Sequence, residues 1–377
     1  MERLYDKLKA YSESDFYAFH MPGHKRNKAL LGIELPYDLD ITEIDGFDDL
    51  HHADGILKEE QERAARVFGA EESHFLVNGS TAGILSAVMG CTHRGDKILV
   101  ARHCHKSIYH AIYMNGLVPR YVYPEFDISM HMNGEISKED VAKALAAEPD
   151  IKAVVIVSPN YDGVVSDVKG IAEVAHSYRI PLIVDEAHGP HFGFHPAFPG
   201  RANDLGADVV INSLHKTLPS LTQTAILHIN GKIVNRRRIK KYLDMLQSSS
   251  PSYIFMASLD ACVDFVDGKC ENAFELYVER LQKFREELKP LQHLQILRTE
   301  HYDISKVVIS TANANITSPE LADRLRKEYH LEMEMTGGTY VLAMTTVADT
   351  QEGLDRLKAA LLEIDGQLEA KTAVSGS

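Results

Sequence analysis

The chain has 377 residues, 45% of them hydrophobic, and its 40 basic and 54 acidic residues give a formal charge of −14 at pH 7. This composition suits a globular protein with one large and one smaller domain, and the negative charge disfavours nucleic acid or an anionic membrane surface as a partner. The amino terminus lacks an apolar signal core and eighteen apolar residues never run together, so we expect a cytoplasmic protein.

Residues 1–50 are predicted to form an arm outside the main domains. They are rich in Pro, Gly, His and Asp, and the most unusual pieces are "FHMPGHKRN" and "DITEIDGFDDLHH". The arm has few residues suited to a core of its own, which fits a loop laid across a neighbouring subunit.

Residues 51–265 are predicted to form a large α/β domain, a mostly parallel sheet with helices on both faces. Helical patterns alternate there with seven short apolar runs, "SHFLV", "KILVA", "RYVYP", "KAVVIVS", "IPLIVDEA", "ADVVINS" and "TAILHI". Such runs, separated by helix-length segments, are typical of strands buried on both faces of a parallel sheet.

Residues 266–366 are predicted to form a smaller α+β domain. Three apolar runs, "LQILR", "SKVVIS" and "TYVLAMTT", alternate there with helical patterns. Residues 367–377 form a polar tail, whose last residues, "KTAVSGS", we expect to be disordered or left over from cloning.

The stretch "FLVNGSTAGIL" is the first candidate ligand site. A strand runs into Gly79, Ser80 and Thr81 and then into a helical pattern. Glycine allows close backbone approach, a helix amino terminus offers free N–H groups and a positive dipole end, and the hydroxyls add donors. The stretch predicts a phosphate cradle, although a plain helix N-cap would use the same residue types.

The strand in "IPLIVDEAHG" supplies the second candidate. Asp185 ends the strand, and Ala187 lies two residues on, hence on the same face. Ligands bind at the carboxyl edge of such sheets, and a carboxylate there favours a cation such as a protonated ring nitrogen, with the small Ala187 leaving room for a flat ring. A helix cap at this turn is the alternative interpretation.

The third candidate is Lys216 in "NSLHKTLPS", which follows the apolar run "ADVVI" and lies close behind Ser213 and His215. A lysine beside a phosphate cradle and an acid for a ring nitrogen is what pyridoxal phosphate chemistry requires, because the amine forms a Schiff base and the ring withdraws electrons. The three motifs together predict a pyridoxal phosphate site.

With these motifs the chain resembles the pyridoxal phosphate-dependent ornithine, lysine and arginine decarboxylases, which have the aspartate aminotransferase type of fold (fold type I). The resemblance runs from "FHMPGHKRN" to "YVLAMTT", and its most specific pieces include "MPGHK", "TEIDGFDDLHH", "NGSTAG", "RHCHKS", "SPNYDGVVSD", "VDEAHGPHFGFHP", "SLHKTLPSLTQ" and "SSSPSYIFMASLD". It implies decarboxylation of arginine, lysine or ornithine to carbon dioxide and an amine of the polyamine pathway.

The resemblance also implies roles for single residues. Lys216 would form the Schiff base and Asp185 would pair with the pyridine nitrogen, while His105 would stack on the ring face opposite Ala187. Lys216, Asp185 and His105 are therefore the expected catalytic residues. The expected cofactor-binding set is Gly79, Ser80, Thr81, His105, Asp185, Ala187, His188, Ser213, His215 and Lys216, in which Ser80, Thr81, Ser213 and His215 hold the phosphate.

Members of the resembled family form dimers with active sites at the interface, so we expect a homodimer or a larger assembly with shared sites. The arm, Ser250 and Ser252 would approach the partner's site. The distal cation of a basic substrate would meet a carboxylate, for which the candidates are Asp45, Asp48, Asp49 and Glu334.

Two alternatives to a decarboxylase remain open. Longer family members continue into a further carboxyl-terminal module, so a noncatalytic relative that keeps the cofactor pocket is one alternative. Another enzyme of the same fold, an aminotransferase or a lyase, is the second. The strand region "MEMTGGTYVLAMTT" contains no arginine to clamp a substrate carboxylate, which favours carbon dioxide release, unless Arg298 or another arginine reaches the site.

No metal site is expected. His188, His191 and His195 have spacings of three and four, but intervening glycines and prolines forbid a regular helix there. The four cysteines, Cys91, Cys104, Cys262 and Cys270, form no C-x-x-C pair, so free buried thiols are expected.

Overall fold

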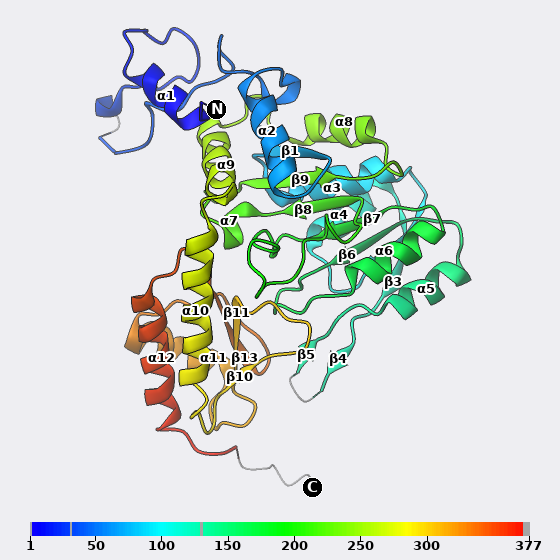
Figure 1. Ribbon diagram of the computed structural model, residues 1–377, viewed down its shortest axis with the longest axis vertical. Coiled ribbons are helices and arrows are strands. Elements are labelled where there is room, and N and C mark those ends of the chain that lie inside the picture. Colours follow the sequence, from blue (N-terminus) through cyan, green and yellow to red (C-terminus); the bar gives the residue numbers. More distant parts are fainter. Residues whose placement is uncertain (1, 31, 129–130, 372–377) are drawn as a thin grey trace.

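A seven-stranded sheet forms the centre of the larger part of the chain in the computed structural model, which describes residues 2–30, 32–128 and 131–371 (Figure 1). Its strands, in spatial order, are β1 (Glu72–Leu76), β9 (Ala225–Ile229), β8 (Val209–Asn212), β7 (Leu182–Asp185), β6 (Ile151–Val157), β2 (Lys97–Ala101) and β3 (Val118–Val122). Antiparallel pairing joins β9 to both of its neighbours, whereas the other pairs are parallel. Each predicted apolar run supplies one strand, so the predicted mostly parallel sheet is confirmed.

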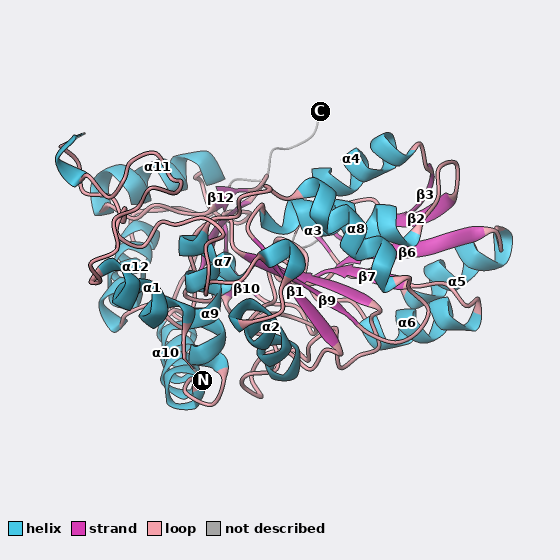
Figure 2. Cartoon of the chain, turned by 90° about the horizontal axis from the view of Figure 1, so that it is seen from above, coloured by secondary structure: helices cyan, strands magenta, loops and turns pink. Residues whose placement is uncertain are grey.

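Helices cover both faces of this sheet (Figure 2). One layer contains α3 (Gly79–Cys91), α4 (Lys106–Asn115) and α8 (Arg236–Leu246), and the other contains α2 (Ile56–Val67), α5 (Lys138–Ala147) and α6 (Val168–Ser177). Side chains alternate along the central strands, so that in β2 Ile98 and Val100 enter one apolar core while Leu99 and Ala101 enter the other. This two-sided burial is why the strands are apolar throughout.

A smaller antiparallel sheet follows, in the order β10 (Gln295–Leu297), β11 (Lys306–Ser310), β13 (Tyr340–Met344) and β12 (Met335–Thr336). It packs with α10 (Glu271–Glu287), α11 (Ser318–Tyr329) and α12 (Gln351–Asp365) around its own apolar core. This is the expected smaller α+β unit. The predicted tail lies partly outside the described residues, since 372–377 are not among them.

Short elements complete the chain. They are α1 (Leu4–Ser12), the two 3-10 helices Lys28–Leu30 and Leu50–His52, the two-stranded ribbon β4 (Phe126–Asp127) and β5 (Met132–Asn133), α7 (Leu214–Thr217) and α9 (Tyr253–Val266). All four cysteines are free thiols, and only Cys91 is not fully buried. Among the described residues, no helix is both long enough and apolar enough to cross a bilayer.

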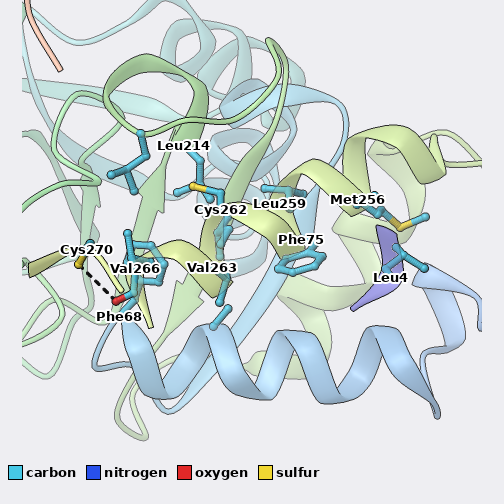
Figure 3. Packing of buried hydrophobic residues seen from close by; sticks show 14 of the residues in the cluster. Leu4, Phe68, Phe75, Leu214, Met256, Leu259, Cys262, Val263, Val266 and Cys270 are labelled. Carbon is cyan, nitrogen blue, oxygen red and sulfur yellow. Dashed lines mark hydrogen bonds between the residues drawn. The ribbon is translucent and has the colours of Figure 1, made fainter. Parts of the chain in front are cut away.

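The amino-terminal helix α1 is docked on α9. Leu4 is buried in the same cluster as Met256, Leu259 and other α9 side chains, as Figure 3 shows. The Leu4 N–H also donates a hydrogen bond to Asp260 Oδ2 at 2.8 Å. The arm therefore begins on the surface of the large domain, whose core supplies the apolar contacts that the arm cannot make by itself.

A buried acid near this contact should make the stability depend on pH. Glu60 has no exposed surface, and burial followed by the neighbouring Asp260 raises the pKa of Glu60 to about 8. The folded protein thus keeps a proton that the unfolded chain releases above the ordinary glutamate pKa of 4.5. The free energy of unfolding should therefore fall as the pH rises from about 4.5 to about 8.

We expect Glu60→Gln to remove this part of the pH dependence. One unit of pKa shift corresponds to about 1.4 kcal/mol. The difference in free energy of unfolding, variant minus wild type, should therefore be larger at pH 9 than at pH 6 by at least about 1 kcal/mol. Urea unfolding at the two pH values measures this gain. Glu59→Gln, an exposed change on the same helix, is the control, and an unchanged pH dependence in Glu60→Gln would contradict the assignment.

Candidate active site

The ends of four strands meet at one edge of the large sheet. The strands β2, β6, β7 and β8 pair in parallel, and β9 runs against both β8 and β1, so β1 has the same direction as the other four. Gly79, His105, Asp185 and Ser213 follow or end β1, β2, β7 and β8, respectively. The topology therefore brings the predicted site motifs to a single edge.

The first turn of α3 forms a cradle of N–H and hydroxyl groups. Gly79 has a φ of +71°, in the left-handed region that favours glycine, at the turn from β1 into the helix. The Asn78 side chain does not cap α3, because its Oδ1 accepts the Ser248 N–H at 3.0 Å instead. The plain N-cap interpretation is therefore wrong, and the first-turn N–H groups lack a capping side chain.

Hydroxyl groups join this turn to the end of β8. The Ser80 and Ser213 hydroxyls are hydrogen-bonded to each other, and the exposed Thr81 lies on the same first turn of α3. His215 Nδ1–H donates to the Thr224 carbonyl at 2.8 Å, which fixes the ring proton on Nδ1 and leaves Nε2 as an acceptor. The three hydroxyls can donate to an anion, whereas the neutral His215 ring cannot.

Asp185 is a buried acid at the end of β7. Asp185 is only 4% exposed, and its Oδ1 accepts a hydrogen bond from the Ala187 N–H at 3.1 Å. Burial raises the pKa of Asp185 to about 6, and the nearby Lys216 amine opposes this shift. Residues 186–208 form turns and no helix, so the helix-cap alternative is wrong here. A cation beside this carboxylate would stabilise its charged form.

Lys216 lies on the short helix α7 and contacts His188. The distance from Lys216 Nζ to His188 Nε2 is 2.9 Å. Burial lowers the pKa of Lys216, with Asp185 and Glu334 opposing the shift. A lysine with a lowered pKa is more often unprotonated at neutral pH, which is the form that acts as a nucleophile.

His188 is also enclosed. Burial, then the charges of Lys306 and Lys216, lower its pKa well below the usual histidine value, so the ring is neutral at neutral pH. The Tyr161 ring lies 4.6 Å from the His188 ring, centroid to centroid, and the Tyr161 hydroxyl donates to Glu334. His188 thus stands between the large sheet and groups of the smaller unit.

His105 begins α4 at the same edge of the sheet. Its Nδ1 is hydrogen-bonded to Ser107 Oγ at 2.8 Å, which orients the ring. Burial first, and then the Lys216 charge, lowers the pKa of His105. The imidazole is therefore mainly neutral at neutral pH, and His105 is exposed, which leaves its ring accessible to a ligand.

A second buried lysine was missed in the sequence. Lys306 opens β11 with no exposed surface, and its Nζ lies 3.4 Å from His188 Nδ1. Asp303, also without exposed surface, bonds His191 Nε2 at 3.1 Å and accepts the Ser305 hydroxyl at 2.7 Å. The sequence "DISKVVIS" predicts a strand but gives no sign of a buried lysine, because a lysine at the start of a strand usually reaches water.

Other predicted groups lie elsewhere. The Asp48 carboxylate accepts the N–H groups of Asp54, Gly55 and Leu57 at 3.0, 2.9 and 2.9 Å, so it holds the start of α2. Asp49 caps the 3-10 helix at Leu50–His52. Of the four carboxylates considered for the substrate's distal cation, Glu334 is the one whose charge acts on Lys216.

The histidines of "HGPHFGFH" contact three different groups. His188 bonds Lys216, His191 bonds Asp303 and His195 Nε2 lies 2.9 Å from Glu275 Oε2.

Arg285, on α10, is an arginine of the smaller unit that supports the site. Its guanidinium donates to the carbonyls of Ile304 and Lys306 at 3.0 and 2.9 Å. It fixes the start of β11, the strand whose Lys306 approaches His188.

The residues present fit a phosphorylated pyridine aldehyde. Asp185 is a buried carboxylate whose raised pKa calls for a cation, which a protonated ring nitrogen supplies. Lys216 offers an amine near that carboxylate, and Ala187 is too small to block a ring. The uncapped start of α3 and the Ser80–Ser213 pair suit a phosphate.

The chain is similar to known proteins along most of its length. The family described as "Orn/Lys/Arg decarboxylase, major domain" matches residues 3–368. The arginine decarboxylase of Bacillus subtilis (strain 168) is 34% identical over 380 residues, which cover 97% of this chain and 77% of that protein. The lysine decarboxylase LdcA of Pseudomonas aeruginosa is 29% identical over 286 residues, which cover 67% of this chain and 38% of that protein.

A solved structure gives the same fold. The lysine decarboxylase LdcF of Francisella novicida superposes with a TM-score of 0.84 at 20% identity, over 97% of this chain and 60% of that one. The chain thus spans 60% of the length of this solved relative. The likeness confirms the predicted fold class.

Proposed function

The chain belongs to the Orn/Lys/Arg decarboxylase family, and we propose that it is a pyridoxal phosphate-dependent decarboxylase of a basic amino acid. The observation that carries the proposal is the group formed by the buried Asp185 and His188 and the partly buried Lys216 at the sheet edge, beside the uncapped start of α3. Arginine is the favoured substrate, because the relative named an arginine decarboxylase is 34% identical over 97% of the chain, whereas the lysine decarboxylase LdcA is 29% identical over 67%.

Pyridoxal phosphate is the cofactor, and when bound it supplies an aldehyde for the substrate amine and a ring that accepts the electron pair left by departing carbon dioxide. The phosphate would be held by Ser80, Thr81, Ser213 and the N–H groups of the first turn of α3, which begins at Gly79. His215 would add a donor only as an imidazolium, because Nε2 of the neutral ring is an acceptor. His105 and Ala187 would bound the two faces of the ring, and Asp185 would bind its protonated nitrogen.

Proton transfer is the task of Lys216 and His188. The Lys216 amine would take up a proton when the substrate amine replaces it on the cofactor, and the resulting ammonium would give that proton to the substrate Cα after carbon dioxide leaves. The amine restored in this way would then be the nucleophile that releases the product. His188, hydrogen-bonded to Lys216 Nζ, orients this amine and can exchange a proton with it. His188 is buried and Lys216 is partly buried, which limits the water that would compete for the proton.

The proposal predicts which product forms from each substrate. The purified protein with pyridoxal phosphate is incubated separately with arginine, lysine and ornithine, and carbon dioxide, agmatine, cadaverine, putrescine and keto acid are measured. We expect carbon dioxide and agmatine from arginine in equal amounts. Keto acid in place of amine would indicate an aminotransferase, and no product from any of the three would favour a noncatalytic relative that keeps the cofactor pocket.

We further propose that the protein is a homodimer in which the arm contacts the partner near its site. The arm displays an apolar surface, in which Phe16, Tyr17, Phe19 and Met21 are 68%, 70%, 90% and 63% exposed. An exposed apolar cluster of this kind is typical of an interaction surface.

Phe19→Asp is expected to weaken dimerisation by at least about tenfold, since it places a charge in an apolar interface. Sedimentation equilibrium of the wild type and the variant measures the dissociation constant of the dimer. A wild-type monomer that binds pyridoxal phosphate tightly would contradict the shared site.

A further inference from the structure

His188 lies between two lysines that belong to different parts of the chain. Its Nε2 is 2.9 Å from Lys216 Nζ on α7, and its Nδ1 is 3.4 Å from Lys306 Nζ on β11. The imidazole therefore connects the edge of the large sheet to the smaller unit through its two nitrogens.

The chemistry of these groups limits how the protons are placed. A neutral imidazole has one N–H donor and one acceptor nitrogen, whereas an ammonium group can only donate. His188 can therefore accept a hydrogen bond from only one of the two lysines. Toward the other lysine it must be the hydrogen-bond donor. One of the two lysines has to present an unprotonated nitrogen to the ring.

The surroundings indicate that Lys306 is the charged lysine. Asp303 and Lys306 are both without exposed surface; the Asp303 carboxylate pairs with His191 at 3.1 Å, and the charges of Asp303 and Lys306 also act on each other. The pKa of Asp303 is lowered, so this acid is ionised. Burial acts to raise this pKa, but the charges of His191 and then Lys306 help to lower it. Burial lowers the pKa of Lys306 only to about 8, which leaves its ammonium form dominant at neutral pH.

Lys216, in contrast, must be unprotonated to act as a nucleophile. The ammonium of Lys306 then donates to His188 Nδ1, and His188 Nε2–H donates to Lys216 Nζ. We propose that Lys306 is a positioning residue that fixes the proton of His188 on Nε2, where it faces Lys216. This inference rests on the proposed function, because it assigns a supporting group to the proton transfer at Lys216.

Lys306 acts through His188 and does not touch the substrate. The residue has no exposed surface, and its stem packs on Gly163, where an added Cβ would lie 2.7 Å from Lys306 Cγ. Gly163 has a φ of +102°, so a side chain at this position is disfavoured both by space and by backbone conformation. Gly163→Ala is consequently a second way to displace Lys306 without removing its charge.

The position of the His188 proton can be measured without any turnover. Full-length protein is labelled with histidine carrying 15N at Nδ1 only and is studied by magic-angle-spinning NMR, with and without pyridoxal phosphate. The His188 signal is identified by its loss in His188→Gln. In the wild type without cofactor, where Lys216 carries a free amine, we expect an unprotonated Nδ1, with the Nε2–H form in excess by at least about tenfold, since hydrogen bonds to charged groups are strong.

Lys306→Met keeps the length of the side chain and removes its charge. We expect the Nδ1 signal of His188 to become a mixture of protonated and unprotonated forms in this variant, and the same change in Gly163→Ala. Val308→Ala, which shortens a buried side chain on the same strand, is the control for loss of packing and should leave the signal as in the wild type.

Lys306→Met should also change the pH at which His188 titrates. Removal of the Lys306 cation should move the His188 titration to higher pH, whereas loss of packing alone would not. The charged and titratable groups facing this pair are Lys216, Tyr161, His105, His191, Asp303 and Glu334, and each remains in the Lys306→Met and Val308→Ala variants.

A protonated Nδ1 on His188 in the wild type would overturn the proposal, and this measurement stands even if Lys306→Met fails to fold. An unchanged Nδ1 signal in folded Lys306→Met would overturn it as well. The readout requires no substrate, so a protein that shows the expected tautomer but no carbon dioxide release would refute the proposed function and leave the role of Lys306 intact.

Discussion

Replacing Lys216 with alanine is expected to lower kcat/KM for decarboxylation by at least about 10³-fold. The loss should be this large because one amine has to bind the cofactor, protonate the substrate Cα and displace the product. Lys216 is suited to these tasks by its burial, its lowered pKa and its contact with His188. Steady-state release of carbon dioxide from arginine measures the effect.

Borohydride reduction followed by peptide mass spectrometry tests the same assignment independently of turnover. The reduced pyridoxyl group should be found on Lys216. Lys106, which follows His105 at the start of α4, is the control, since Lys106→Ala should retain the adduct and most of the activity. An adduct on Lys106 would contradict the assignment of Lys216.

Asp185→Asn is expected to lower kcat by about 10²- to 10³-fold while the protein still binds pyridoxal phosphate. The carboxylate keeps the ring nitrogen protonated, and an amide cannot do so, so the ring accepts electrons less well. Absorbance titration measures cofactor affinity and carbon dioxide release measures kcat.

Glu186→Gln is the matched control for this change. Glu186 is the next residue and is also buried, but its carboxylate bonds Asn212 Nδ2 and the Ala202 N–H, at 3.0 and 2.8 Å. Burial raises the pKa of Glu186 to about 8, so a neutral amide resembles its usual state. We expect kcat within about threefold of the wild type. Near-normal turnover in Asp185→Asn would remove Asp185 from its proposed role.

The fold could be predicted from the sequence because the strands are buried on both faces. Runs such as "KAVVIVS" and "ADVVINS" have an unbroken apolar centre, "AVVIV" and "VVI", and each became a central strand. The candidate site followed for the same reason. Asp185 and Ser213 break an apolar run at its carboxyl end, and in a parallel sheet these ends meet at one edge.

Side chains whose partners lie far away in the sequence could not be predicted. Lys306 is 118 positions from His188, and an alternating or apolar pattern says nothing about such a contact. Asp48 illustrates the opposite problem, because an acid in a polar loop suggests a ligand group, whereas its carboxylate holds backbone N–H groups at the start of α2. In both cases the tertiary arrangement decides what the charge does.

The position of β1 at the edge of the large sheet has a consequence for biosynthesis. Its partner in the sheet is β9, and the hydrogen-bonded residues Ser73 and His228 are separated by 155 positions. At typical translation rates, β1 waits on the order of 10 s before β9 leaves the ribosome. During that time the apolar residues Phe75 and Leu76 lack their native strand partner. The nascent chain is therefore most exposed to misassociation at its first strand, and chaperone binding should concentrate there.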